Sequence, residues 1–281
     1  MPLTELIHYC NDRNRERYGA LCPADTLHLA GGRVRAQVQC AAGKLTLSSA
    51  FQPIAHSRDG RLAGHEALIR AQSEDGRLLT TEELFAPLTD EEVVFIDRLC
   101  RTVHVLNFLL QGDARQDLYL NLHPRHVLAV SCDHGRVFEE LIRRCGLTPQ
   151  QLVLEMRDGA GMDWRQREIA ILNFRQRGYR VAVDNFGRDR GDIERLRDLD
   201  VDIVKLDASL LSATDDAGRL RRAVELAQDL GALTVAEGIE TAAQLERARD
   251  SGVDRLQGFL LGSPQPACHA TQTTLFSPQL H

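Results

Sequence analysis

The sequence has no long apolar run, few aromatic residues and no excess of positive charge. No window in its 281 residues approaches the roughly 18 to 20 consecutive apolar residues that a membrane-spanning helix needs. The segment Met1–Tyr18 is polar and charged, unlike the apolar centre of a signal peptide. We therefore expect a cytoplasmic protein without a membrane span.

Cysteine pairs that could hold zinc are also missing. The seven cysteines are scattered and form no Cys-x-x-Cys motif, which predicts free thiols in a reducing compartment rather than disulfides or a zinc site. A net charge of −6 disfavours binding of duplex DNA through a broad basic face. The hydrophobic content of 43% and charged content of 26% are typical of a globular protein with a sizeable core.

The beginning of the chain differs in pattern from the rest. Apolar residues at helical spacing predict a helix over Leu3–Tyr18, and short strands over Thr26–Ala30 and Val34–Gln39 flank Gly31 and Gly32, as in a β-hairpin. We interpret this part as an extension packed on the main body. The predicted division is an extension over 1–47, a main domain over 48–268 and a tail over 269–281.

From residue 51 onward, short aliphatic runs alternate with longer amphipathic segments. The predicted helices are Glu91–Leu110, Arg136–Cys145, Trp164–Gly178, Arg219–Gly231 and Ala242–Gly252. The predicted strands are Phe51–Ala55, His65–Ile69, Asp117–Asn121, Leu152–Glu155, Val181–Asp184, Ile203–Leu206, Leu233–Ala236 and Leu256–Phe259. About eight strands alternating with helices predict an α/β fold of the (β/α)₈ barrel type. An open doubly wound sheet is the alternative, disfavoured because no GxGxxG turn follows the first strand.

Seven of these strands carry, at or near their ends, a residue that can bind metal or phosphate. One such residue is more often a helix cap or a solvated loop residue, but seven in register are hard to explain that way, because parallel strand ends converge on one rim of a barrel. Carboxylate and amide oxygens are the ligands that Mg²⁺ and Mn²⁺ prefer, so we expect a divalent cation site there. The seven are Glu66, Asn121, Glu155, Asp184, Lys205, Glu237 and Gln257.

The motifs around these residues resemble, in order and spacing, the EAL domain of bacterial cyclic di-GMP signalling. The resemblance runs from Phe51 to Pro264. It rests on FQPI at 51–54, EALIR at 66–70, Asn121 in NLHP, Glu155 in LEMRD, DNFG at 184–187, KLD at 205–207, AEGIE at 236–240 and QGFLLGSP at 257–264.

This resemblance implies a modified (β/α)₈ barrel that binds cyclic di-GMP and, when active, hydrolyses it to 5′-pGpG with two Mg²⁺ or Mn²⁺ ions. It implies a water-holding role for Lys205 and a proton-accepting role for Glu237. Asp184 is implied to bridge the two ions, while Glu240 supports the site from behind the metal ligands. The implied metal ligands are Glu66, Asn121, Glu155 and Asp184, and the implied nucleotide contacts are Gln52, Arg70, Gln257 and Pro264.

The sequence departs from active members of the family in the DNFG motif. These members usually have two consecutive aspartates there, and the second is replaced by Asn185, which brings no charge and predicts weaker binding of the second ion. The following loop over 188–192 carries Arg188, Asp189 and Arg190 where the family has small residues. Asp158 replaces a supporting glutamate that is longer by one methylene, and His123 replaces a serine.

Three functions remain open at this point. The departures favour a receptor or regulatory module that recognises cyclic di-GMP with impaired or absent hydrolysis. The alternatives are an active cyclic di-GMP phosphodiesterase and a protein-interaction scaffold that binds no nucleotide. The resemblance also implies a homodimer, and a protein partner would follow from a receptor role.

Overall fold

The chain folds around a closed barrel of eight strands. The computed structural model describes residues 1–23, 25–111, 116–130, 134–157, 164–188, 196–197, 200–212, 217–270 and 273–276. Around the barrel the strands run in the order β3, β4, β6, β7, β8, β9, β10 and β11, and β11 pairs with β3 to close it. Their bounds are Gly43–His56, Leu62–Ser73, Asp117–Asn121, Leu152–Arg157, Arg180–Phe186, Ile203–Leu206, Leu233–Ala236 and Arg255–Leu256. The predicted α/β barrel is confirmed.

One strand runs against the others. β3 pairs antiparallel with both β4 and β11, whereas the remaining barrel strands pair in parallel. The predicted barrel is therefore a mixed one, with β3 reversed. The reason lies in the short link 57–61 between β3 and β4, because a parallel connection needs a crossover of a dozen or more residues, while an antiparallel one needs only a tight turn.

The predicted helix and hairpin at the beginning of the chain are present. Helix α1 covers Leu3–Tyr18, and strands β1 (Leu27–Ala30) and β2 (Arg33–Cys40) form a hairpin. Its turn residues Gly31 and Gly32 have φ of 59° and 74°, the left-handed conformation that a tight hairpin turn of this kind requires. β2 pairs with the first half of β3, so the hairpin extends the barrel sheet. Since β3 runs across residue 47, the division into 1–47, 48–268 and 269–281 stays a prediction.

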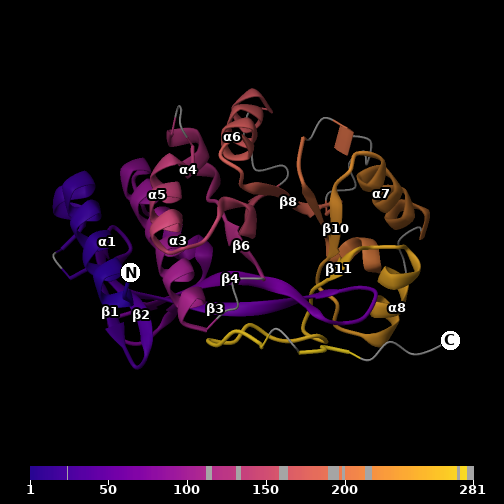
Figure 1. Cartoon of the computed structure of the whole chain (residues 1–281), viewed down its shortest axis with the longest axis horizontal. Helices are drawn as coiled ribbons and strands as arrows, with labels where there is room; N and C mark the ends of the chain where they lie inside the picture. Colours follow the sequence, from indigo (N-terminus) through magenta and orange to yellow (C-terminus); the bar gives the residue numbers. More distant parts are fainter. Residues whose placement is uncertain are drawn as a thin grey trace.

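Helices cover the outside of the barrel (Figure 1). All five predicted helices are present with small shifts at their ends, while α2 and α4 escaped prediction because each is too short to show a helical period. The helices after α1 are α2 (Thr81–Phe85), α3 (Asp90–Gln111), α4 (Pro124–Ala129), α5 (Arg136–Arg144), α6 (Trp164–Gln176), α7 (Ala217–Asp229) and α8 (Ala242–Asp250). A two-residue strand, β5 (Leu78–Leu79), and the 3-10 turns Gly19–Leu21, Pro149–Gln151 and Ala208–Leu211 complete the elements.

The core has two parts. The larger part packs the outer face of the barrel against the helices, with α3 almost entirely buried. The smaller part fills the barrel interior with Ile54, Ala63, Tyr119, Val153, Ala182, Ile203 and Val235. No helix in the described ranges is long and apolar enough to cross a membrane.

A close approach between the backbones of β4 and β6 gives a test of this packing. A Cβ atom on Gly64 would lie 2.3 Å from the carbonyl oxygen of Asp117 on the neighbouring strand, so β4 and β6 would have to move apart. We expect Gly64→Ala to lower the free energy of unfolding by about 2–3 kcal/mol, as overpacking does. Gly146→Ala is the control, since Gly146 has open space around it and costs only its left-handed φ of 74°, about 1 kcal/mol. Urea unfolding that shows equal losses would contradict the packing.

Candidate active site

Strand alternation places the candidate residues in one layer inside the barrel. Side chains two positions apart on a strand point to the same face, and the interior apolar residues lie two positions from the candidates. The pairs are Ile54 with Gln52, Tyr119 with Asn121, Val153 with Glu155, Ala182 with Asp184, Ile203 with Lys205 and Val235 with Glu237. The apolar layer therefore forms a floor, and the polar layer lies directly above it. Because β3 is antiparallel, its polar residue precedes the apolar one.

Lys205 is the centre of the polar layer. Its side chain is 1% exposed, and its Nζ lies 2.7 Å from Glu155 Oε1, 2.9 Å from Glu237 Oε1, 3.1 Å from Glu66 Oε2 and 3.5 Å from Asp184 Oδ1. Burial opposes the charge on Lys205, but the surrounding carboxylates outweigh burial and raise the pKa of its ammonium well above the ordinary value. The structure thus brings together five residues, four from different strands and Glu237 from the position directly after β10.

Glu66 is the best-satisfied carboxylate of the group. Its Oε1 accepts a hydrogen bond from Asn121 Nδ2 at 2.9 Å, and its Oε2 accepts one from Gln257 Nε2 at 2.7 Å. Burial would raise the pKa of Glu66, but Lys205 and these hydrogen bonds together hold it below the usual value. Glu66 is therefore ionised, and Asn121 and Gln257 fix its orientation.

Glu155 is the least-satisfied carboxylate. It is 1% exposed, and its Oε2 is buried without a hydrogen-bond partner. Burial, together with the negative charges of Glu66 and Asp184, raises the pKa of Glu155 well above its ordinary value. Burying a carboxylate oxygen without a hydrogen-bond donor costs free energy. A cation bound to this oxygen would offset that cost.

The charges of the polar layer fit divalent cations. When ionised, four carboxylates (Glu66, Glu155, Asp184 and Glu237) face one ammonium, so the layer carries an excess of negative charge. Oxygen ligands from carboxylates and an amide suit Mg²⁺ or Mn²⁺. Within the described ranges, no three acidic, histidine or cysteine side chains stand ready around one cation position, because the carboxylates converge on the Lys205 ammonium instead. Cation binding thus requires small side-chain rotations away from Nζ.

Asn185 makes a direct contact with the carboxylate beside it. Its Nδ2 donates a hydrogen bond to Asp184 Oδ2 at 2.7 Å. Asn185 also has a φ of 58°, the one left-handed non-glycine residue among those the structure describes, and asparagine and aspartate tolerate that conformation better than most residues. One oxygen of Asp184 is therefore held by an amide, and the other lies near Lys205.

A cavity of about 1020 Å³ opens next to this layer. Besides Glu66, Asn121, Asp184, Asn185 and Glu237, it is lined from α2 and α3 and by Arg157 and Arg188. Sequence reasoning missed the wall from α2 and α3, because α2 is too short for a period and the α3 residues look like core residues of a buried helix. The missed residues include Thr80, Phe85, Asp97, Cys100, Arg101 and His104.

Asp97 fixes the loop that follows Asn121. The Asp97 carboxylate accepts a hydrogen bond from the backbone N–H of His123 at 3.0 Å and pairs with Arg101 and with His126 Nδ1, the latter at 2.8 Å. The His123 ring stacks on Phe85 with 4.3 Å between centroids. Burial opposes the charge on Asp97, but Arg101 and His126 outweigh it and hold the pKa of Asp97 below its usual range.

The barrel, its reversed strand and the polar layer match a known family. The EAL domain profile covers residues 34–264. This chain belongs to the EAL domain family. Its match begins within β2, so helix α1 lies outside the part that the family shares.

Three proteins similar to this EAL chain are longer than it is. It is 28% identical over 226 residues to the probable cyclic di-GMP phosphodiesterase PdeB of Escherichia coli, over 77% of this chain and 42% of PdeB. The Bacillus subtilis YkuI protein, solved in complex with c-di-GMP and calcium, shares the fold with a TM-score of 0.69 at 24% identity, over 80% of this chain and 57% of YkuI. Klebsiella pneumoniae BlrP1, in a manganese/cy-diGMP complex, has a TM-score of 0.67 at 25% identity, over 78% and 56%. The chain thus spans about half the length of these proteins or less.

Of the nucleotide contacts implied by the EAL resemblance, Gln52 and Gln257 lie in the polar layer. Gln257 Nε2 donates to Gln52 Oε1 at 3.2 Å, and Gln52 lies opposite Glu66 on the paired strands. Arg70 lies further along β4, half-buried, and donates to the carbonyl of Ile69 at 3.0 Å. Pro264 is half-buried in the segment after β11.

Of the supporting residues implied by the resemblance, the structure describes Glu240, which is not joined to the polar layer. The side chain of Glu240 is exposed at the start of α8, where its backbone N–H donates to Gln244 Oε1 at 2.9 Å. Asp158 and positions 189–192 of the altered loop lie outside the described residues. The assigned roles of all these residues stay predictions.

Glu237 provides a test of the electrostatics of the layer. Burial first, and then the negative charges of Asp184 and Glu66, raise its pKa from 4.5 to about 8. Since the folded state holds a proton that the unfolded state has lost, the metal-free protein should lose about 1–2 kcal/mol of stability as the pH rises from about 6.5 to 8. Urea unfolding in EDTA measures this slope.

Two variants decide whether that slope comes from Glu237. Glu237→Gln should make it less steep, because one titrating carboxyl is removed while Glu155, whose pKa is raised as well, remains. Glu240→Gln should leave it unchanged, since Glu240 is exposed three residues later. An unchanged slope in Glu237→Gln would contradict the assignment.

Proposed function

We propose that this EAL domain binds cyclic di-GMP as a receptor in bacterial second-messenger signalling and hydrolyses it slowly or not at all. The names of its relatives, and the ligands of its structural neighbours, support cyclic di-GMP as the ligand. The cavity beside the polar layer supports a ligand of this size, since small-molecule sites commonly measure about 300–1000 Å³. Its arginines supply positive charge for phosphate groups.

Recognition of the nucleotide is assigned to Gln52, Arg70, Gln257 and Pro264. The two glutamines form a hydrogen-bonded pair at the edge of the polar layer, where amide donors and acceptors can meet a guanine edge or a phosphate. Arg70 suits a phosphate because its planar guanidinium offers two parallel charge-assisted bonds. The Arg70 guanidinium lies near enough to the cavity residue His104 to lower the pKa of that imidazole, after burial and Arg101.

Divalent cations would be held by Glu66, Asn121, Glu155 and Asp184, with Asn185 as a weak ligand for a second ion. Two such ions, when bound, lower the pKa of a water molecule and stabilise charge on the scissile phosphate. In this proposal, Lys205 Nζ would hold the attacking water. Glu237, whose Oε1 lies 2.9 Å from Nζ, would accept its proton.

The proposal of impaired hydrolysis rests on the hydrogen bond between Asn185 and Asp184. An aspartate at position 185 would offer a second negative ligand and could not donate to Asp184, whereas Asn185 occupies Asp184 Oδ2 with an N–H at 2.7 Å. A second ion, when bound, would have one negatively charged ligand fewer and would compete with the Asn185 amide for Asp184 Oδ2. Two-ion chemistry weakens, while the contacts proposed for the nucleotide stay in place.

An active phosphodiesterase that forms 5′-pGpG is the second candidate. It is favoured by one observation, the complete set of carboxylates around Lys205. A homodimer remains part of the proposal and is supported by the exposed Ile169 and Leu172 on α6. A scaffold that binds no nucleotide is the third candidate.

Binding and turnover separate these candidates. In Ca²⁺, we expect submicromolar binding of cyclic di-GMP by calorimetry, weakened at least about tenfold by Arg70→Ala because charge-assisted bonds to phosphate are lost. Arg61→Ala, which removes an exposed arginine paired with Asp59, should bind as the wild type does. Absence of any binding heat would support the scaffold and contradict the proposal.

Restoring the aspartate at position 185 tests whether Asn185 is the cause of the impaired hydrolysis. We expect Asn185→Asp to raise single-turnover formation of 5′-pGpG in Mn²⁺ by at least about tenfold, because a charged second-ion ligand returns. Glu66→Ala in that background should abolish the gain. A wild-type rate already in the ordinary enzyme range, about 1 s⁻¹ or faster, would show the active phosphodiesterase instead.

A further inference from the structure

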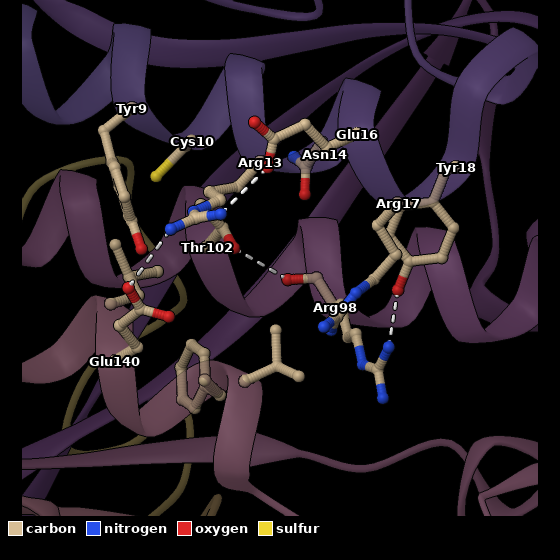
Figure 2. A pocket seen from close by; sticks show the side chains of 13 residues that line it. Tyr9, Cys10, Arg13, Asn14, Glu16, Arg17, Tyr18, Arg98, Thr102 and Glu140 are labelled. Carbon is tan, nitrogen blue, oxygen red and sulfur yellow. Dashed lines mark hydrogen bonds and ion pairs between the residues drawn. The ribbon is translucent and has the colours of Figure 1, made fainter.

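A second cavity, of about 330 Å³, lies between α1, α3 and α5 (Figure 2). It shares no lining residue with the cavity at the polar layer. One of its walls is α1, which precedes the part of the chain matched by the EAL family. The cavity is therefore built partly from residues that the family does not share, and the proposed function does not use it.

The inner surface of this cavity is apolar. Cys10 from α1 is 5% exposed, and Phe138 and Leu141 from α5 are 7% and 6% exposed. Burial raises the pKa of the Cys10 thiol to about 12, so it is neutral and behaves as a small apolar group. This floor suits the hydrocarbon part of a ligand.

The mouth holds one group of charges that neutralise each other. Arg13 pairs with Glu16 at 2.9 Å and with Glu140 at 3.8 Å. Tyr9 is hydrogen-bonded to Glu140 and Arg13, and Glu140 also pairs with Arg144 at 3.5 Å. These side chains close one side of the cavity and leave no unmatched charge there.

Arg17 and Arg98 form the other side, and their charges are not matched. Arg98 Nη1 donates to the hydroxyl of Tyr18 at 2.6 Å, and the Tyr18 ring packs on Phe95 with 4.8 Å between centroids. Within the part of the chain that the structure describes, no carboxylate pairs with either guanidinium. Figure 2 shows both side chains extending from α1 and α3 into the same opening.

We propose that this cavity binds a small organic anion, with its apolar body on Cys10, Phe138 and Leu141 and its anionic group between Arg17 and Arg98. Guanidinium groups bind phosphate and carboxylate through paired charge-assisted hydrogen bonds. The carbonyl end of α1 carries a partial negative charge, which the two full positive charges outweigh. The volume admits a compound of about one ring with one acidic group.

Calorimetric titration with phenyl phosphate, benzoate and phenol, at low salt and with the full chain, tests the proposal. We expect phenyl phosphate or benzoate to bind at least about tenfold more tightly than phenol, which has the ring without the charge. The tighter of the two anions tells whether the site prefers phosphate or carboxylate. Equal affinities for anions and phenol, or no heat with any of them, would overturn the proposal.

Two substitutions test whether the anion binds in this cavity. Arg17→Gln changes an exposed side chain and should weaken binding of the anion at least about tenfold. Arg15→Gln changes another arginine of α1 outside the cavity lining and should leave anion binding unchanged. Both variants should bind cyclic di-GMP as the wild type does. Equal weakening by Arg15→Gln, or none by Arg17→Gln, would contradict the site.

Discussion

The site depends on the burial of one lysine among four carboxylates. Lys205 can remain charged at the top of the barrel interior only because the acidic side chains surround it, and those acids can remain close only because Lys205 lies between them. Breaking a buried ion pair by removing one partner typically costs about 3–5 kcal/mol. This cluster carries more negative than positive charge. Some of its carboxylates can therefore give up their contact with Lys205 and bind cations instead.

The barrel supplies the geometry of this interaction. The position of residues such as Glu155 and Lys205 at or near strand ends, read from the sequence, was enough to predict that they meet at one rim. The sequence did not reveal that β3 runs backwards, since a strand looks the same in either direction; only the short link after His56 carried that information. The cavity wall from α2 and α3 was also unpredictable, because Asp97 and Arg101 lie within an apolar helix whose period shows burial and not contact with a ligand.

The replacement at Asn185 was visible in the sequence, but its consequence was not. Sequence reasoning could say only that a charge is missing. The structure adds the hydrogen bond from Asn185 to Asp184, which depends on a left-handed backbone that no sequence pattern specifies. At the proposed cation site the substitution would thus change two ligands, one by removing its charge and the other by occupying its oxygen, while the EAL fold around them is kept.

Counting Mn²⁺ ions bound in the presence of cyclic di-GMP, by electron paramagnetic resonance of free Mn²⁺, tests this account most directly. The account predicts one ion bound tightly and a second bound at least about tenfold more weakly, since one carboxylate ligand is lost. In Asn185→Asp the second ion should approach the affinity of the first. Two ions of equal affinity in the wild type would contradict the central claim that the Asn185 amide disables the second position.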